Sequence, residues 1–193
     1  MSAVIRPAVE TDAAQILSIY SPIVTHTAIS FEVAPPTVDE MRARISSTLA
    51  RFPWLVSSEA EQVLGYAYAS QHRQRAAYQW SVDVSVYVRT DVQRRGVARS
   101  LYVSLFEILR SEGYYTAFAG ITLPNEASIG LHTRLGFEPV GVYRGVGYKL
   151  GCWHDVSWWQ LTLRAAEGIP SPPRAFATPG DSNEPRQESP GTK

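Results

Sequence analysis

The stretch VDVSVYV, residues 82–88, limits the possible folds of this chain more than any other. Every second residue in it is a valine, and Asp83, Ser85 and Tyr87 stand between the valines. Because successive side chains of a strand point to opposite faces of the sheet, this alternation predicts a β-strand with one apolar and one polar face. A carboxylate on so apolar a strand is costly unless it is hydrogen-bonded or faces a wet cleft. Asp83 is therefore a candidate for a structural hydrogen bond or for catalysis.

Strand-like and helix-like runs alternate along the rest of the chain. Thr11 or Asp12 is expected to cap a first helix, and Thr37 with Glu40 forms a capping-box pattern that opens a second one. A long helix is expected at residues 97–112, where apolar side chains recur at helical spacing at Val97, Leu101, Leu105 and Ile108. Further strands are expected at residues 3–8, 54–58, 63–71, 116–123, 137–149 and 153–163, and a short helix at 125–135. The predicted order, β-α-α-β-β-β-α-β-α-β-β, is an α/β fold of the α+β type: a mixed sheet with helices on its faces.

The turn before the long helix carries unusual local charge. Arg94 and Arg95 precede Gly96, and Arg99 lies in the first helical turn. Free backbone N–H groups and the helix dipole attract phosphate oxygens to a helix N-terminus, and a glycine without a Cβ lets a ligand come close. The turn therefore predicts an anion site, although a solvated helix cap fits the same residues.

Three polar side chains share one stripe of the short helix at 125–135. Asn125, Ser128 and His132 follow one another at intervals of three and four residues, which places them on one face. A histidine has a reference pKa of about 6.5 and can carry a proton near neutral pH. His132 is thus a candidate proton carrier, with a purely structural role as the alternative.

Composition excludes several classes of protein. The 18 Lys and Arg residues balance the 18 Asp and Glu residues, so no global field draws the chain to nucleic acid or to an anionic membrane. The single cysteine, Cys152, excludes an intramolecular disulfide, and its spacing from the four histidines matches no metal motif. No signal core and no run of about 18 apolar residues is present, so a cytoplasmic location without a membrane partner is expected.

The composition shifts near residue 165. Residues 165–193 hold six of the thirteen prolines and one aromatic residue, Phe176. So few core-forming side chains cannot offset the entropy of ordering the chain. We therefore predict one folded domain at residues 1–164 and a disordered Pro-rich tail at 165–193, with a partner-binding Pro-rich segment as the alternative.

Two motifs together resemble a known family. They are the Q-x-x-G-x-A turn of Gln93 and Gly96, and the N-x-x-S-x-x-x-H-x-x-x-G-F pattern that begins at Asn125. With the surrounding text AYQWSVDVSVYV, VQRRGVARSLY, ITLPNEASIGLH and GYKLGCWHDVSWWQL, the chain resembles the GNAT family of N-acetyltransferases, and within it the phosphinothricin N-acetyltransferase branch. The resemblance covers about residues 4–163 and implies a single GNAT-like domain with a mixed, mostly antiparallel sheet.

The resemblance also implies where acetyl-CoA binds as co-substrate, with no metal. Backbone groups of the strand would hold it, and Asn125 would reach it from the neighbouring helix. The strand residues are Val86, Tyr87 and Val88, and the turn that would cradle the pyrophosphate consists of Arg94, Arg95, Gly96, Val97, Ala98 and Arg99.

The resemblance implies that Asp83 and His132 take part in catalysis. His132 stands where the family usually has a tyrosine general acid, and the phosphinothricin branch has histidine there. Asp83 stands where that branch usually has a glutamate general base, and aspartate reaches one methylene less far. An amine must lose a proton before it attacks a thioester, so either residue is a candidate, Asp83 directly or through water. Which group returns a proton to the CoA thiolate stays open.

The implied reaction is transfer of the acetyl group to the free amine of a small amino-acid-like substrate such as phosphinothricin, methionine sulfoximine or methionine sulfone. Cationic and aromatic side chains suited to such a substrate are Phe31, Arg75, Tyr78 and Lys149. The branch is dimeric, so a homodimer is expected. The alternatives are a non-catalytic acetyl-CoA-binding module and a protein N-terminal acetyltransferase.

Overall fold

A mixed sheet forms the centre of the computed structural model, which describes residues 3–177. Within this range seven strands lie in the order β1-β2-β3-β4-β5-β7-β6, and all neighbours are antiparallel except β4 and β5. The strands are β1 (Val4–Pro7), β2 (Trp54–Glu59), β3 (Gln62–Gln71), β4 (Ser81–Val88), β5 (Thr116–Thr122), β6 (Glu138–Lys149) and β7 (Cys152–Thr162). The predicted element order and the mostly antiparallel sheet are confirmed.

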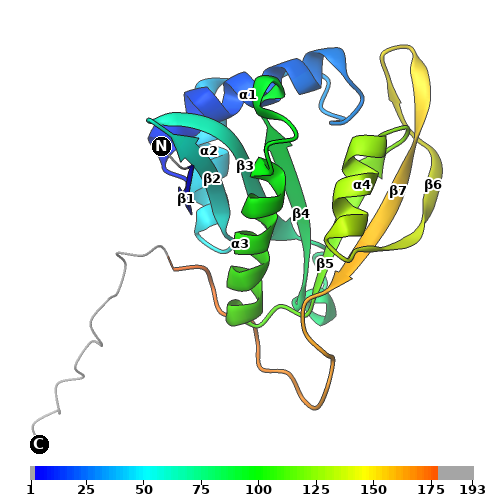
Figure 1. The fold of residues 1–193 in the computed structure, drawn as a ribbon. Helices are drawn as coiled ribbons and strands as arrows, with labels where there is room; N and C mark the ends of the chain where they lie inside the picture. The colour runs from blue at the N-terminus through cyan, green and yellow to red at the C-terminus, as the bar shows by residue number, and fades with distance from the viewer. Residues whose placement is uncertain (1–2, 178–193) are drawn as a thin grey trace, which may run out of the picture.

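Helices cover both faces of the sheet (Figure 1). On one face lie α1 (Ala13–His26) and α2 (Val38–Leu49), and on the other α3 (Val97–Glu112) and α4 (Glu126–Arg134). Short 3-10 turns occur at η1 (Glu10–Asp12), η2 (Ala76–Tyr78) and η3 (Thr90–Val92). The expected capping box opens α2: the Thr37 hydroxyl accepts from the Glu40 backbone N–H, and the Glu40 carboxylate accepts from the Thr37 backbone N–H.

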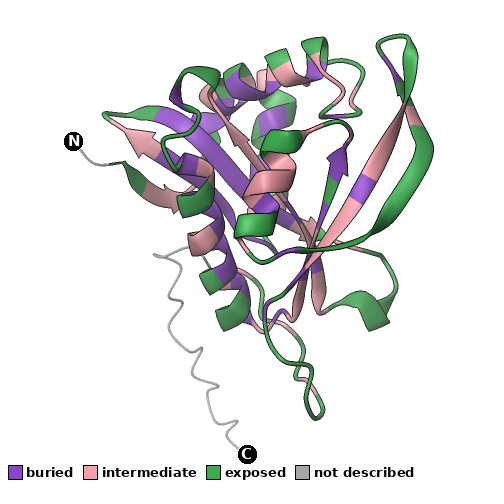
Figure 2. Cartoon of the chain, turned by 45° about the vertical axis from the view of Figure 1, so that its right-hand side comes forward, coloured by how far each residue is buried: buried purple, intermediate pink, exposed green. Residues whose placement is uncertain are grey.

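Each face of the sheet has its own apolar core. Buried residues gather on the strands and on the helices packed against them (Figure 2). The core under α3 contains Val82 and Val84 of β4, whereas the core under α1 and α2 receives Tyr87 from the opposite face. The alternation of β4 is as predicted, but its second face is not a solvated one. Because both faces are covered, β4 is held in place from both sides, which suits a strand that carries a reactive group.

Two local expectations are wrong. On α3 the buried stripe uses Leu109, which is fully buried, and Ile108 packs only at its edge. At the start of α1, Asp12 makes no side-chain cap to the helix. Its carboxylate accepts from the Val9 backbone N–H and pairs with Arg6 instead. A partly buried ion pair to β1 takes the place of the cap.

The hairpin of β6 and β7 leaves much apolar surface uncovered. Trp153 is 68% exposed, while Trp158 is half-buried and pairs with Gly120 of β5. The neighbouring side chains of His154 and Asp155 bond in different directions. Nε2 of His154 lies 3.0 Å from the Lys149 carbonyl, and Asp155 accepts from Arg144 and from the backbone of residue 145.

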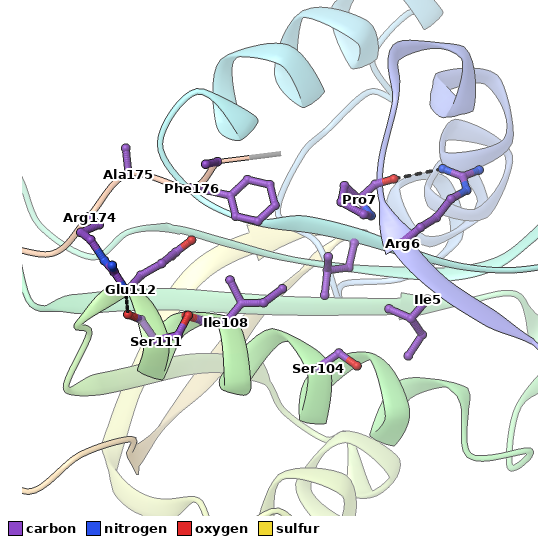
Figure 3. A pocket seen from close by; sticks show the side chains of 12 residues that line it. Ile5, Arg6, Pro7, Ser104, Ile108, Ser111, Glu112, Arg174, Ala175 and Phe176 are labelled. Carbon is purple, nitrogen blue, oxygen red and sulfur yellow. Dashed lines mark hydrogen bonds between the residues drawn. The ribbon is translucent and has the colours of Figure 1, made fainter. Parts of the chain in front are cut away.

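Residues 165–177 of the predicted tail lie against the domain. Trp80 Nε1 donates to the Ser171 carbonyl, and the backbone N–H groups of Arg174 and Phe176 donate to carbonyls of the domain. The Phe176 ring points toward a cavity beside α3 and β1 (Figure 3). Disorder therefore does not hold for this stretch, because backbone hydrogen bonds and one aromatic ring tie it down. Residues 178–193 lie outside the described range, and the domain boundary at 164 stays a prediction.

Candidate active site

A cleft opens where β4 and β5 separate. The two strands pair only from Ser81 to Asp83, so the edge of β4 beyond Asp83 has no strand beside it. The cleft between them is lined from β4, β5, α3 and α4 by Val84, Ser85, Val86, Tyr87, Tyr102, Ala119, Gly120, Ile121, Thr122, Asn125, Ser128 and His132, and from the loop after α1 by Ile29.

Backbone N–H groups of β4 face this cleft. The Arg89 N–H donates to Leu64 of β3, and successive residues of a strand point their backbone groups in opposite directions. The N–H groups of Val86 and Val88 therefore point to the open edge. The sequence analysis also expected the backbone of Tyr87 to hold acetyl-CoA. Its backbone groups point toward β3 instead, and its side chain packs in the core under α1 and α2.

The N-terminus of α3 is free of side-chain capping. Gly96 is its N-cap residue with φ of +83°, and no side chain bonds to the first turn. A Cβ placed at Gly96 meets no atom within 4 Å, so the space is open to a ligand. Arg94 and Arg99 are exposed and form no ion pair within residues 3–177, while Arg95 lies 3.7 Å from Glu59. Free N–H groups and free positive charge together suit a phosphate group.

The stripe on α4 is present as predicted and lines the cleft. Asn125 caps the helix through its side-chain oxygen, which accepts from the Ser128 N–H at 3.1 Å. His132 is only 3% exposed, and its Nδ1 donates to the Ser128 carbonyl at 2.8 Å. Its Nε2 is therefore an acceptor, and it lies 3.3 Å from the Tyr102 hydroxyl. Burial lowers the pKa of His132, against the Ser128 hydrogen bond, which raises it.

Tyr102 is a site residue that the sequence analysis missed. It is fully buried, and burial raises the pKa of its hydroxyl well above the usual value. Tyr102 lies on the inner face of α3, and its spacing from the other apolar residues of that helix is the same as for a residue that only packs in the core. A neutral His132 that accepts from Tyr102 cannot donate a proton at Nε2 in this arrangement, so the two residues act as one unit.

Asp83 lies at the last position of β4 that pairs with β5, and its side chain is on the sheet face toward α1. Its side chain is 29% exposed, and its Oδ1 lies 2.7 Å from Nδ1 of His72. Burial raises the pKa of the Asp83 carboxyl, and His72 and Arg73 oppose that rise. The sequence analysis missed His72, because only the β3–β4 register, which pairs Ser70 with Asp83, brings the two together.

Aromatic rings surround His72. Its ring stacks on Phe118 of β5 with centroids 4.3 Å apart and an interplanar angle of 15°. Tyr78 and Trp158 meet it edge-on at 6.0 and 6.3 Å. Arg75, the predicted carboxylate binder, is exposed on the same loop as Tyr78 and forms no ion pair within the described chain. Tyr78 thus lies beside the pair of His72 and Asp83, and Arg75 stands at the N-cap of the same 3-10 turn as Tyr78.

Phe31 approaches from the loop between α1 and α2. It is 38% exposed and lies directly over Gly147 of β6, where a Cβ would come within 2.2 Å of its ring. The loop is fixed by Tyr20, whose hydroxyl is hydrogen-bonded to Ser30 and Glu32. Gly147 is therefore required for this position of Phe31.

Lys149 is not part of the site, contrary to the sequence prediction. It is 7% exposed, and its Nζ donates to the carbonyls of Val24 and Ser30, each at 2.6 Å. Burial lowers the pKa of its ammonium group, and Glu32 raises it. The side chain fastens the end of α1 and the following loop to β6, and it is not among the residues that line the cleft.

A larger cavity, of about 480 Å³, lies elsewhere, between α3, β1 and residues 174–177 (Figure 3). It shares no lining residue with the cleft. Its main ionisable group is Glu112, whose Oε2 is buried without a hydrogen-bond partner among the described residues. Burial raises the pKa of Glu112 to about 7, and Arg174 opposes the rise.

Residues 3–177 contain no group of three or more His, Cys, Asp or Glu side chains that could hold a metal ion. In the same range, none of the helices has the length and apolar character needed to cross a membrane.

Known proteins resemble this chain in sequence and in fold. A family model described as an acetyltransferase (GNAT) domain matches residues 5–158. The phosphinothricin N-acetyltransferase of Streptomyces coelicolor is 40% identical, over 82% of this chain and 95% of that protein. The L-methionine sulfoximine/L-methionine sulfone acetyltransferase of Pseudomonas paraeruginosa is 37% identical, over 88% of this chain and all of that protein. A phosphinothricin acetyltransferase from Sinorhizobium meliloti has a crystal structure in complex with acetyl-CoA. Its sequence is 32% identical to this chain, and the two structures superpose with a TM-score of 0.84 over 89% of this chain and 94% of that chain.

Proposed function

Because this chain belongs to the GNAT family of N-acetyltransferases, we propose that it moves the acetyl group of acetyl-CoA to the free amine of a small amino-acid-like substrate. Phosphinothricin, methionine sulfoximine and methionine sulfone are the proposed acceptors. The observation that carries the proposal is the open backbone edge of β4, which begins where the pairing of β4 with β5 ends, at Asp83. Family membership makes the chain an enzyme, which removes the non-catalytic binding module as an alternative.

Acetyl-CoA fits the side of the cleft next to α3. The open space at Gly96 and the free charges of Arg94 and Arg99 suit its pyrophosphate. The N–H groups of Val86 and Val88 suit the rest of the molecule and the thioester oxygen. The relative from Sinorhizobium meliloti, solved with acetyl-CoA, supports this placement.

The chain's groups have distinct tasks in the transfer. The amine gives up a proton, assisted by Asp83 directly or through a group that it holds, and its lone pair then attacks the thioester carbon. Backbone N–H groups of β4 stabilise the oxygen as it gains charge. The bond from carbon to sulfur breaks, the nitrogen of the new amide gives up its second proton, and the thiolate takes one. The Tyr102 hydroxyl, which lies 3.3 Å from Nε2 of His132, is the proposed group that passes this proton and regains its own hydrogen in the same step.

The substrate side suits an amino acid. Arg75 has a free guanidinium group for a carboxylate, and the rings of Tyr78, Phe118 and Trp158 form a wall beside Asp83. Trp158 Nε1 is buried without a partner among the described residues and is a spare donor for a polar side chain.

The test is release of CoA thiol from acetyl-CoA with a panel of acceptors. Phosphinothricin, methionine sulfone and methionine sulfoximine should be turned over with kcat/KM at least tenfold above that of unmodified amino acids. Peptides with a free N-terminal alanine provide the contrast. A preference for the peptides would establish the protein N-terminal acetyltransferase instead, and no release with any amine would refute the proposal.

We also infer that the enzyme is a homodimer that joins through the β6–β7 hairpin. β6 is an edge strand of the sheet, and most of its residues are exposed. The exposed apolar side chains of the hairpin are Val140, Val142, Tyr143, Val146, Tyr148, Leu150 and Trp153. So large a patch on one hairpin is typical of an interface. Light scattering should give about twice the monomer mass of 21.4 kDa, and a mass near that of the monomer would contradict the dimer.

A further inference from the structure

We propose that His72 is the group that takes the proton from the substrate amine, and that Asp83 is the positioning residue that holds it. The inference rests on the proposed function, since it assigns the base of that reaction. It also changes the role of Asp83, which the resemblance placed as the base itself.

The hydrogen bond fixes which nitrogen of His72 is free. An ionised carboxylate only accepts hydrogen bonds, so Nδ1 of His72 carries the hydrogen that lies 2.7 Å from Asp83 Oδ1. The lone pair of Nε2 then points away from Asp83. Nε2 has no hydrogen-bond partner among residues 3–177, and it is not one of the fully buried unpartnered atoms. It is therefore open to a ligand or to solvent.

The imidazole ring is held in one orientation. Its side chain is only 10% exposed, and it is stacked on Phe118. Tyr78 and Trp158 meet the ring from other directions. His72 is thus oriented by a carboxylate and held in place by packing. A residue that accepts a proton from a substrate is expected to have this arrangement.

The pair also accounts for the short side chain at position 83. An aspartate reaches one methylene less far than the glutamate of the resembling branch. His72 comes from the end of β3, beside Asp83, and extends the reach of that carboxylate by one imidazole ring. The negative charge then stays with Asp83, while the proton is taken at Nε2.

The proton transfer balances without any further reagent. The ammonium group of the substrate loses a proton to Nε2 of His72, and the neutral amine keeps its lone pair for the attack. The resulting imidazolium is stabilised by the Asp83 carboxylate, as in other carboxylate–histidine pairs. The other ionisable groups facing this pair are Arg73, whose guanidinium lies over Trp158, and Tyr78. Solvent removes the proton from the imidazolium after product release.

The decisive variant is His72→Asn. The Asn amide occupies the place of Nδ1 and still donates to Asp83, but it has no basic nitrogen. We expect kcat/KM for the amine to fall about 10² to 10³-fold, with the KM for acetyl-CoA unchanged and the melting temperature preserved. His26→Asn is the matched control, because His26 is exposed on α1, and it should keep full activity. If His72→Asn keeps more than a third of kcat/KM, Asp83 is the direct base and the inference is wrong.

The pH profile separates a base from a structural residue. Without its base, His72→Asn should use only amine that is already neutral, so its kcat/KM should rise about tenfold per pH unit up to the pKa of the amine. The wild type should reach its plateau at lower pH. Parallel profiles for the two proteins would also overturn the inference.

Asp83→Asn tests the positioning role. Its amide can donate to Nδ1 and so place the hydrogen of His72 on Nε2, the wrong tautomer. Nitrogen-15 spectra of the imidazoles should show the hydrogen on Nδ1 in the wild type and on Nε2 in Asp83→Asn, which is a readout without any substrate. The double variant should be no worse than the poorer single variant, because the two residues act as one unit. Absence of turnover with every acceptor refutes the proposed function, whereas turnover that survives His72→Asn refutes only this inference.

Discussion

The two sides of the cleft are built in different ways. The side assigned to acetyl-CoA comes mainly from one continuous stretch, residues 86–99, and it works chiefly through backbone N–H groups. The side assigned to the amine is assembled from the loop after α1, the end of β3, β4, β5 and β7, and it works through side chains such as His72, Asp83 and Trp158. Backbone recognition needs only local geometry, whereas side-chain recognition needs the whole sheet in register.

The difference separates two kinds of kinetic effect. A change on the backbone side should alter the affinity for the co-substrate and leave the chemistry alone. A change on the side-chain side should alter kcat or the use of the amine. Variants on the two sides of the cleft can therefore show whether co-substrate binding and chemistry are separate.

The largest effect is expected for Asp83→Ala. Loss of the carboxylate removes the proton acceptor or its support, so kcat should fall about 10² to 10⁴-fold while the KM for acetyl-CoA stays within twofold. Steady-state kinetics and a melting curve measure this. Asp39→Ala, an exposed residue on α2, is the control. A folded Asp83→Ala enzyme with near-wild-type kcat would exclude Asp83 from the chemistry.

Lys149→Met should damage stability rather than substrate use. The variant keeps the length of the side chain but leaves the carbonyls of Val24 and Ser30 without their donor, at a cost of about 2 to 4 kcal/mol. Denaturant unfolding measures the loss. Arg144→Met is the control on the same strand, since its ion pair is exposed and worth about 0 to 1 kcal/mol. A raised KM for the amine without loss of stability would show that Lys149 binds the substrate after all.

Gly96→Ala should act on acetyl-CoA alone. A Cβ at this position stands in the open space and disfavours the positive φ of +83°, so the KM for acetyl-CoA should rise about tenfold. The KM for the amine should stay within twofold. Gly145→Ala is the control, because residue 145 also has a positive φ and open space but lies on the β6–β7 hairpin. Equal changes in both KM values would show that the two sides are not separable.

The smallest effect on catalysis is expected for Glu112→Gln, which lies outside the cleft and should leave both KM values and kcat unchanged. The folded state raises the pKa of Glu112 to about 7, so it holds a proton that the unfolded chain releases. The wild type therefore loses stability as the pH rises from about 4.5 to 7. Glutamine does not titrate, so the variant should be more stable by about 3 kcal/mol at pH 8 and by about 1 kcal/mol or less at pH 5.

Thermal unfolding at the two pH values measures this difference. Glu107→Gln, an exposed residue on the same helix, is the control and should show no such dependence. A variant that is less stable than the wild type at pH 8 would mean that the carboxylate has a partner in solution.

The sequence by itself determined the order of the elements and the local parts of the site. The alternation on β4, the capping box at Thr37, the turn at Gly96 and the stripe on α4 each depend on residues within one turn or one strand. Such features follow from backbone geometry and short-range hydrogen bonds, which a single stretch of sequence specifies. The family resemblance rested on the strand, the turn and the α4 stripe among these, and also on the stretch GYKLGCWHDVSWWQL at the β6–β7 hairpin.

Only the tertiary structure decided which distant side chains meet. The β3–β4 register brought His72 to Asp83, the packing of α3 on α4 brought Tyr102 to His132, and the β6 hairpin drew Lys149 away from the site to two backbone carbonyls. These contacts depend on the relative placement of elements far apart in the chain. Spacing along the sequence does not encode that placement, because it arises from burial shared by the whole core.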